Sequence, residues 1–169
     1  MAYKNKIFLI GFMGSGKTTL GKRLAKKLDK PFLDLDVEIE KSESLTINQI
    51  FEKFGETHFR ELESKVLKAL IINNKQFVLS LGGGTPCDKK NMDLINNSGA
   101  SIYLKYNAGI LASRLIGGKA ERPLIKNLDE NQLKEFITNK LIEREVFYDQ
   151  CKFTIENNNV RVEDLIELI

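Results

Sequence analysis

One glycine-rich segment restricts what this 169-residue chain can fold into. Residues 11–18 read G-F-M-G-S-G-K-T and match the phosphate-loop pattern G-x-x-x-x-G-K-[ST]. An apolar run, residues 7–10, comes directly before the loop, and residues 17–30 after it carry leucine at every fourth position. A phosphate loop requires a strand, a glycine loop and a helix in this order. The sequence therefore predicts an α/β fold built around this unit.

The residue types in the loop have a common chemical purpose. Glycines let the backbone curl so that several N–H groups point into one concavity, and the following helix adds the positive end of its dipole. Lys17 can reach the β- and γ-phosphates of a nucleoside triphosphate, and the Thr18 hydroxyl can bind Mg²⁺. The loop thus predicts binding of a nucleoside triphosphate with Mg²⁺; a glycine turn that binds nothing is the alternative.

The rest of the chain alternates between strand and helix patterns. We expect strands at residues 6–10, 32–35, 77–81, 100–105 and 152–155. We expect helices at residues 17–30, 37–41, 46–54, 56–73, 88–97, 108–116, 129–148 and 160–169. Strands separated by helices predict a five-stranded parallel sheet covered on both faces, a three-layer α/β/α P-loop fold. In such sheets ligands bind beyond the carboxyl ends of the strands.

Composition narrows the class of protein further. Apolar residues make up 42% and charged residues 29%, as in globular domains, and the net charge of +3 is too small to indicate nucleic-acid binding. No apolar run approaches the roughly 20 residues of a membrane span, and the N-terminal segment is too short for a signal peptide. Cys87 and Cys151 are expected to be free thiols in a reducing compartment. We therefore expect one domain over residues 1–169, in the cytoplasm, with no nucleic-acid or membrane partner.

Two carboxylates close the second predicted strand. If the strand continues through Asp34 and Asp36, their side chains face the same side about 7 Å apart. That separation is too large for sharing one proton, so it suits two tasks, with one carboxylate facing Mg²⁺ and one facing an acceptor hydroxyl. The alternative is a solvated strand end at which Asp36 caps the next helix.

Two arginines indicate an anionic acceptor. On the last long helix, Arg144 falls within about 20° of Leu133 on the helical wheel, so it projects from the apolar face. A buried guanidinium needs an anionic partner, and its fork suits a carboxylate; an internal salt bridge is the alternative. Arg60 has Glu63 one turn further along its helix, and there a surface ion pair is the alternative.

Four further features bear on the predicted site. A polar loop at residues 117–127 contains Arg122 and suits a lid that closes on the γ-phosphate, unless it is simply a solvated loop. Arg114 could stack on a base. Glycines 82–84 would let a small molecule approach backbone N–H groups, with an ordinary turn as the alternative. His58 is expected to be exposed, and as the only histidine it provides no metal-ligand set and no Ser-His-Asp triad.

Taken together, these segments resemble shikimate kinase, a small member of the nucleoside-monophosphate-kinase-like P-loop group. The matching segments are GFMGSGKTTLGKRLA, FLDLD, FGETHFRELE, LGGG, RPL and the R-x-x-x-Y of residues 144–148. The phosphate loop is shared by many families, whereas the combination of D-L-D, G-E-x-x-F-R-x-x-E and three glycines is much more specific. The resemblance implies transfer of the ATP γ-phosphate to the 3-hydroxyl of shikimate, in the route to chorismate and the aromatic amino acids.

The resemblance also implies individual residue roles on the nucleotide side, with ATP as co-substrate and Mg²⁺ as cofactor. Lys17 would contact the β- and γ-phosphates, and Arg122 would close onto the γ-phosphate from the lid. Thr18 would ligate Mg²⁺ directly and Asp34 would hold it through water. The ATP phosphates would lie on Gly14, Ser15, Gly16, Lys17, Thr18 and Thr19.

On the acceptor side, the resemblance implies a substrate-binding segment at about residues 37–73. Asp36 would bind shikimate hydroxyls and act catalytically, by orienting the attacking hydroxyl or by taking its proton. Arg60 and Arg144 would hold the shikimate carboxylate, with Glu63 steadying Arg60. Gly82 and Gly83 would line the same pocket. We expect a monomer whose partners are these small molecules.

Three other functions compete with this interpretation. A kinase of another polyol acid, such as gluconate, would keep the phosphate loop but is not expected to carry G-E-x-x-F-R-x-x-E. An adenylate-kinase-like enzyme would need a nucleotide-sized acceptor pocket and normally a larger chain. A nucleotide-dependent switch would leave the inward Arg144 unexplained, and the sequence holds no N-K-x-D motif.

Overall fold

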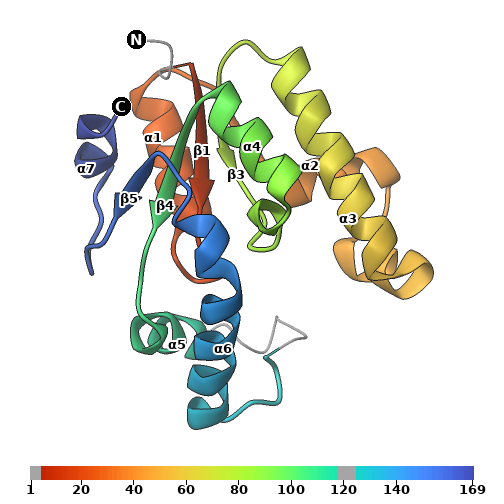
Figure 1. Ribbon diagram of the computed structural model, residues 1–169, viewed down its shortest axis with the longest axis vertical. Coiled ribbons are helices and arrows are strands. Elements are labelled where there is room, and N and C mark those ends of the chain that lie inside the picture. The colour runs from red at the N-terminus through yellow and green to blue at the C-terminus, as the bar shows by residue number, and fades with distance from the viewer. Residues whose placement is uncertain (1–4, 118–124) are drawn as a thin grey trace.

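Five parallel strands form a single sheet in the order β2-β3-β1-β4-β5 (Figure 1). The computed structural model describes residues 5–117 and 125–169. The strands are β1 (Lys6–Ile10), β2 (Phe32–Asp34), β3 (Phe77–Ser80), β4 (Ala100–Leu104) and β5 (Phe153–Ile155). Every pairing is parallel, which confirms the predicted five-stranded parallel sheet.

The helices lie between the strands along the chain, as the pattern predicts. They are α1 (Lys17–Lys27), α2 (Leu35–Glu43), α3 (Ile47–Asn73), α4 (Lys89–Ser98), α5 (Ala108–Ile116), α6 (Glu130–Tyr148) and α7 (Val162–Glu167), with a short 3₁₀ turn η1 (Thr85–Cys87). The two helices predicted at 46–54 and 56–73 form one element, α3, kinked at Gly55, where φ is 80° and ψ is 175°. A positive φ is accessible to glycine at low cost, so the kink falls where the sequence separates the two helical patterns.

Side-chain alternation along β1 places one apolar core on each face of the sheet. Ile7 and Leu9 pack into a core that includes residues of α1, α5 and α7. Phe8 and Ile10 point the other way, into a core shared with α2, α3 and α4. All four side chains are fully buried. The result is the predicted three-layer α/β/α arrangement, in which helices cover both faces of a central sheet (Figure 1).

The second strand ends earlier than the sequence predicts. It stops at Asp34, and α2 begins at Leu35, which is fully buried. Asp34 is the residue that caps the helix, because its side chain accepts a hydrogen bond of 3.2 Å from the backbone N–H of Asp36. The prediction that Asp34 and Asp36 alternate along a strand is therefore wrong, and so is the alternative in which Asp36 is the cap.

The chain segments at the carboxyl ends of β1, β2 and β3 lie at one edge of the sheet because the three strands run in parallel. They contain the phosphate loop, the Asp34–Asp36 junction and the glycines 82–84, respectively. Across the residues that the structure describes, no helix has both the length and the apolar character needed to cross a membrane.

Candidate active site

A cavity of about 520 Å³ lies at this edge of the sheet. It is lined by residues of the phosphate loop, β2, α2, α3, the glycine turn, α5 and α6. The predicted site residues that line it are Gly14, Gly16, Lys17, Thr18, Thr19, Asp34, Asp36, Arg60, Gly82, Gly83, Arg114 and Arg144, together with Glu63. Segments far apart in the sequence thus bring phosphate-binding, acidic and guanidinium groups around one volume.

The phosphate loop wraps around the ammonium group of Lys17. Its Nζ donates hydrogen bonds to the carbonyls of Gly11 at 2.8 Å and Phe12 at 2.9 Å. Gly16, the residue before α1, has a φ of 89°, a left-handed conformation that a side chain would strain. Ser15, also a residue of the loop, is fully buried and does not line the cavity, whereas its neighbours Gly14 and Gly16 do. The N-terminus of α1 and one fixed positive charge therefore face the cavity together.

Two side-chain oxygens that could ligate a metal ion lie beside this loop, those of Thr18 and Asp34. The Thr18 hydroxyl donates a hydrogen bond of 3.1 Å to Oδ2 of Asp34. Hydroxyl and carboxylate oxygens are the hard ligands that Mg²⁺ takes, with its remaining positions left to phosphate oxygens and water. Within the described ranges, no group of three or more His, Cys, Asp or Glu residues is arranged to hold a metal. The chain thus offers an open pair of oxygens that fits a nucleotide-bound Mg²⁺.

The carboxyl group of Asp36, which lines the cavity, has a raised pKa. Burial, reinforced by the charges of Asp34 and Glu63, raises its pKa from 3.8 to about 6, against the opposing charge of Lys17. Asp36 lies in the first turn of α2 and lines the cavity, as does Asp34, whose side chain caps the same helix. A carboxylate with a pKa close to neutrality can accept a proton from a hydroxyl more readily than an ordinary one.

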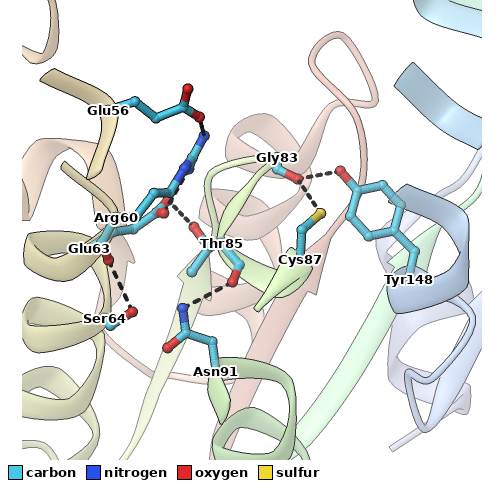
Figure 2. A network of polar contacts seen from close by, with 9 residues as sticks. All are labelled: Glu56, Arg60, Glu63, Ser64, Gly83, Thr85, Cys87, Asn91 and Tyr148. Carbon is cyan, nitrogen blue, oxygen red and sulfur yellow. Dashed lines mark hydrogen bonds and ion pairs between the residues drawn. The ribbon is translucent and has the colours of Figure 1, made fainter. Parts of the chain in front are cut away.

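Arg60 is held by an acidic residue that the core almost completely covers. Its Nη1 donates to Oε2 of Glu63 at 2.8 Å, and its Nη2 lies 3.4 Å from Glu56 (Figure 2). The side chain of Glu63 is only 2% exposed, whereas that of Arg60 is 39% exposed. The alternative of a surface ion pair is therefore wrong, because Glu63 lies inside the fold.

Arg144 reaches the cavity from the opposite side, as its place on the apolar face of its helix predicts. The guanidinium carbon lies 5.4 Å from the centre of the Phe12 ring, and a Cβ added to Gly83 would lie 2.7 Å from its Nη1. No carboxylate among the described residues forms an ion pair with Arg144. The internal salt bridge that was the alternative is thus not found among the described residues, and the anionic ligand expected for Arg144 stays a prediction.

The glycine turn is built to sit against both arginines, which the sequence did not reveal. A Cβ added to Gly84 would lie 2.5 Å from Nη1 of Arg60, and one added to Gly83 would lie 2.7 Å from Nη1 of Arg144. The Gly83 carbonyl accepts hydrogen bonds from the buried Tyr148 hydroxyl at 2.5 Å and from Cys87 Sγ at 3.7 Å (Figure 2). The missing side chains therefore make room for two guanidinium groups.

The remaining predicted residues are placed as follows. Arg114 lines the cavity while its guanidinium lies 4.1 Å from the centre of the Tyr106 ring. Arg122 and most of the predicted lid lie outside the described residues. His58 is exposed, as predicted. Both cysteines are free, and burial raises the pKa of the Cys87 thiol.

A phosphate loop after the first strand, an open pair of magnesium-type oxygens and an acceptor pocket that holds both a carboxylate and two guanidinium groups define a P-loop phosphotransferase with a small acceptor. Comparison with known proteins narrows this class. The sequence model of one family, described as shikimate kinase, matches residues 13–169. Shikimate kinase from Flavobacterium psychrophilum is 46% identical over 165 residues, covering 97% of this chain and 96% of the relative. The chain belongs to the shikimate kinase family.

Solved structures agree with this assignment. A crystal structure of shikimate kinase from Bacteroides thetaiotaomicron has a TM-score of 0.91 and 37% identity, covering 97% of each chain. Shikimate kinase from Acinetobacter baumannii, solved in complex with shikimate, has a TM-score of 0.85 and 34% identity, covering 98% of this chain and 90% of that one. A gluconokinase from Sinorhizobium meliloti shares the fold alone, with a TM-score of 0.57 at 15% identity. The predicted family is thus confirmed, in preference to the gluconate-kinase alternative.

Proposed function

We propose that this chain transfers the γ-phosphate of ATP to the 3-hydroxyl of shikimate, giving shikimate 3-phosphate and ADP. One observation carries the proposal beyond family membership. A phosphate loop, a carboxylate with a raised pKa and two guanidinium groups surround the same volume of about 520 Å³. Shikimate carries a carboxylate and three hydroxyls, which are the groups that such a pocket complements.

On the nucleotide side, the phosphate loop and the N-terminus of α1 bind the phosphates through backbone N–H groups. Lys17 stabilises the negative charge on the oxygens of the transferring phosphoryl group, and Arg122 adds a second positive charge from the loop that contains it. Thr18 and Asp34, whose side-chain oxygens lie together beside the phosphate loop, are the residues that would hold Mg²⁺, with Asp34 acting through water. When bound, Mg²⁺ neutralises charge on the β- and γ-phosphates. Arg114 contributes to adenine binding.

On the acceptor side, Asp36 orients the attacking hydroxyl and accepts its proton as the bond to phosphorus forms. Arg60 and Arg144 bind the acceptor carboxylate, while the backbone of Gly82 and Gly83 lines the pocket between them. These contacts fix both ends of the acceptor and hold its hydroxyl in line with the phosphoryl group. Catalysis of phosphoryl transfer depends largely on such positioning of the reactants. We expect the enzyme to act as a monomer in the cytoplasm.

The proposal is tested by coupled ADP release with Mg-ATP in the presence of shikimate, of gluconate, or of neither. We expect strong stimulation by shikimate alone. Stimulation by gluconate but not shikimate would assign the acceptor pocket to another polyol acid. Slow hydrolysis that neither acceptor changes would instead indicate a nucleotide-dependent switch.

Removing the guanidinium of Arg144 should mainly weaken acceptor binding. Two charge-assisted hydrogen bonds to a carboxylate are lost in Arg144→Ala, so we expect the KM for shikimate to rise about 10- to 100-fold while the KM for ATP changes little. Arg23→Ala, at an exposed position of α1, is the matched control. Equal effects of Arg144→Ala on shikimate and on an analogue without the carboxylate would contradict this role.

Protonation of Asp36 should produce the acidic limb of the pH profile. The pKa of this carboxyl group is raised to about 6, so its ionised form predominates only above that pH. We therefore expect kcat/KM for shikimate, which reports the pKa of the free enzyme, to fall as the pH drops through about 6. A profile that stays flat down to about pH 4.5 would rule out Asp36 as the proton acceptor.

A further inference from the structure

The buried residue directly after the three glycines carries a hydroxyl that no step of the proposed reaction uses. Thr85 has no solvent exposure, and its Oγ1 donates a short hydrogen bond to Oε1 of Glu63 (Figure 2). The other oxygen of this carboxylate, Oε2, accepts the hydrogen bond of 2.8 Å from Arg60. Each oxygen of Glu63 therefore has its own donor, one from the 3₁₀ turn η1 and one from α3.

The backbone around Thr85 fixes the direction of its hydroxyl. Its carbonyl accepts a hydrogen bond of 3.1 Å from Nδ2 of Asn91, a residue of α4 that is 5% exposed. Its N–H donates to the carbonyl of Gly82 at 3.2 Å. Thr85 is thus anchored at both backbone polar groups, and its side chain is the link from this anchored turn to the carboxylate of Glu63.

Glu63 in turn determines where the guanidinium of Arg60 lies. The arginine is more than one-third exposed, and a long exposed side chain has many rotamers available to it. Among the described residues, Glu63 accepts the hydrogen bond of 2.8 Å from Nη1, whereas the exposed Glu56 accepts a longer one of 3.4 Å from Nη2. Nη1 lies close to Gly84 on one side and donates to Glu63 on the other. A rotation of the Glu63 carboxylate would therefore change the direction in which the guanidinium of Arg60 faces the cavity.

Loss of the Thr85 hydroxyl would leave a charged oxygen inside the fold without a partner. Within the described part of the chain, no buried side-chain oxygen or nitrogen lacks a hydrogen bond. A buried carboxylate that loses a donor must rotate toward another one, because an unsatisfied buried charge is costly. The guanidinium of Arg60 already donates to this carboxylate, so such a rotation would draw it away from the acceptor.

We propose that Thr85 is a positioning residue for acceptor binding, which acts through Glu63 to hold Arg60 in the orientation that receives the acceptor carboxylate. The inference rests on the proposed function, since it assumes that Arg60 binds the acceptor. It assigns a role to the residue after the glycine turn, where the sequence offers no motif.

The decisive variant is Thr85→Val, which replaces the hydroxyl with a methyl group of similar size. We expect the KM for shikimate to rise about tenfold, as for one hydrogen bond to a charged group, with the KM for ATP within about twofold of the wild type. Thr85→Ser restores the hydroxyl and should restore the KM. Thr154→Val makes the same chemical change at an exposed position of β5 and should alter neither KM.

A double-mutant cycle separates positioning from a purely structural effect. If Thr85 acts through Arg60, Thr85→Val should raise the KM for shikimate in the wild type and not in an Arg60→Ala background. An unchanged KM in Thr85→Val, a parallel rise in both KM values, or an equal effect in both backgrounds would overturn the inference. If Thr85→Val does not fold, the same cycle is run with Thr85→Ala. Absence of shikimate-dependent turnover in the wild type would instead refute the proposed function itself.

Discussion

Replacing Lys17 with alanine should lower shikimate-dependent ADP release about 10³-fold or more without unfolding the protein. Phosphoryl transfer depends on fixed positive charge around the oxygens of the moving group, because charge spreads over these oxygens in the transition state. The ammonium group of Lys17 lies inside the phosphate loop, within 2.9 Å of two backbone carbonyls. Alanine leaves the loop backbone and the N-terminus of α1 in place, so ATP binding should weaken far less than turnover.

The matched control for this variant is Lys26→Ala, which removes an exposed lysine from the same helix. Both proteins should unfold at similar temperatures, and only Lys17→Ala should lose activity. Measurement of kcat by the coupled assay and of ATP affinity by calorimetry separates chemistry from binding. Full activity of Lys17→Ala would overturn the assignment of the phosphate loop.

The phosphate loop and the sheet could be predicted because their signals are local. The apolar run before residue 11 and the leucine repeat after residue 17 indicate a strand and a helix independently of the rest of the chain. Alternation of such units leaves few topologies, since parallel strands need crossover helices. The predicted positions of Lys17, Thr18 and Asp36 at one sheet edge follow from the same rule.

The junction at Leu35 could not be predicted from this pattern. An apolar residue between two aspartates fits a strand and the first turn of a helix equally well. What decides between them is tertiary: the Asp34 side chain caps the N–H of Asp36, and Leu35 enters the core. The two carboxylates still line one cavity, although for a different reason than strand alternation.

The contacts that shape the acceptor pocket are also invisible in the sequence. The hydrogen bond from Tyr148 to Gly83 joins residues 65 positions apart, and that from Thr85 to Glu63 joins residues 22 apart. No periodicity or spacing rule links such pairs. The helical wheel could direct Arg144 inward, but only the packed fold identifies Phe12 and Gly83 as its neighbours.

Replacing Asp36 with asparagine should abolish most of the activity and stabilise the fold at the same time. Asparagine keeps the shape of the side chain and its capacity to bind a hydroxyl, but it cannot accept a proton. We expect kcat to fall about 10²- to 10⁴-fold, the usual contribution of general base catalysis. The KM for shikimate should change much less, because Arg60 and Arg144 still bind the carboxylate.

The gain in stability follows from the direction of the pKa shift. The pKa of Asp36 rises from 3.8 to about 6 on folding, so the folded chain holds this proton more tightly than the unfolded chain. The contribution of this group to stability therefore declines as the pH rises from about 4 to about 6, and at pH 7 its ionised form is unfavourable. At about 1.4 kcal/mol per pKa unit, removal of the charge should raise the free energy of unfolding at pH 7 by up to about 3 kcal/mol.

Chemical denaturation at two pH values tests this coupling of function and stability. Asp36→Asn should unfold at a higher denaturant concentration than the wild type at pH 7, and the difference should shrink at about pH 4.5, where the wild-type carboxyl group is protonated. Asp93→Asn, at an exposed position of α4, should shift neither stability nor activity appreciably. Equal or lower stability of Asp36→Asn at pH 7 would show that its burial and the neighbouring charges of Asp34 and Glu63 do not strain the folded state, and the acidic limb assigned to Asp36 would lose its physical basis.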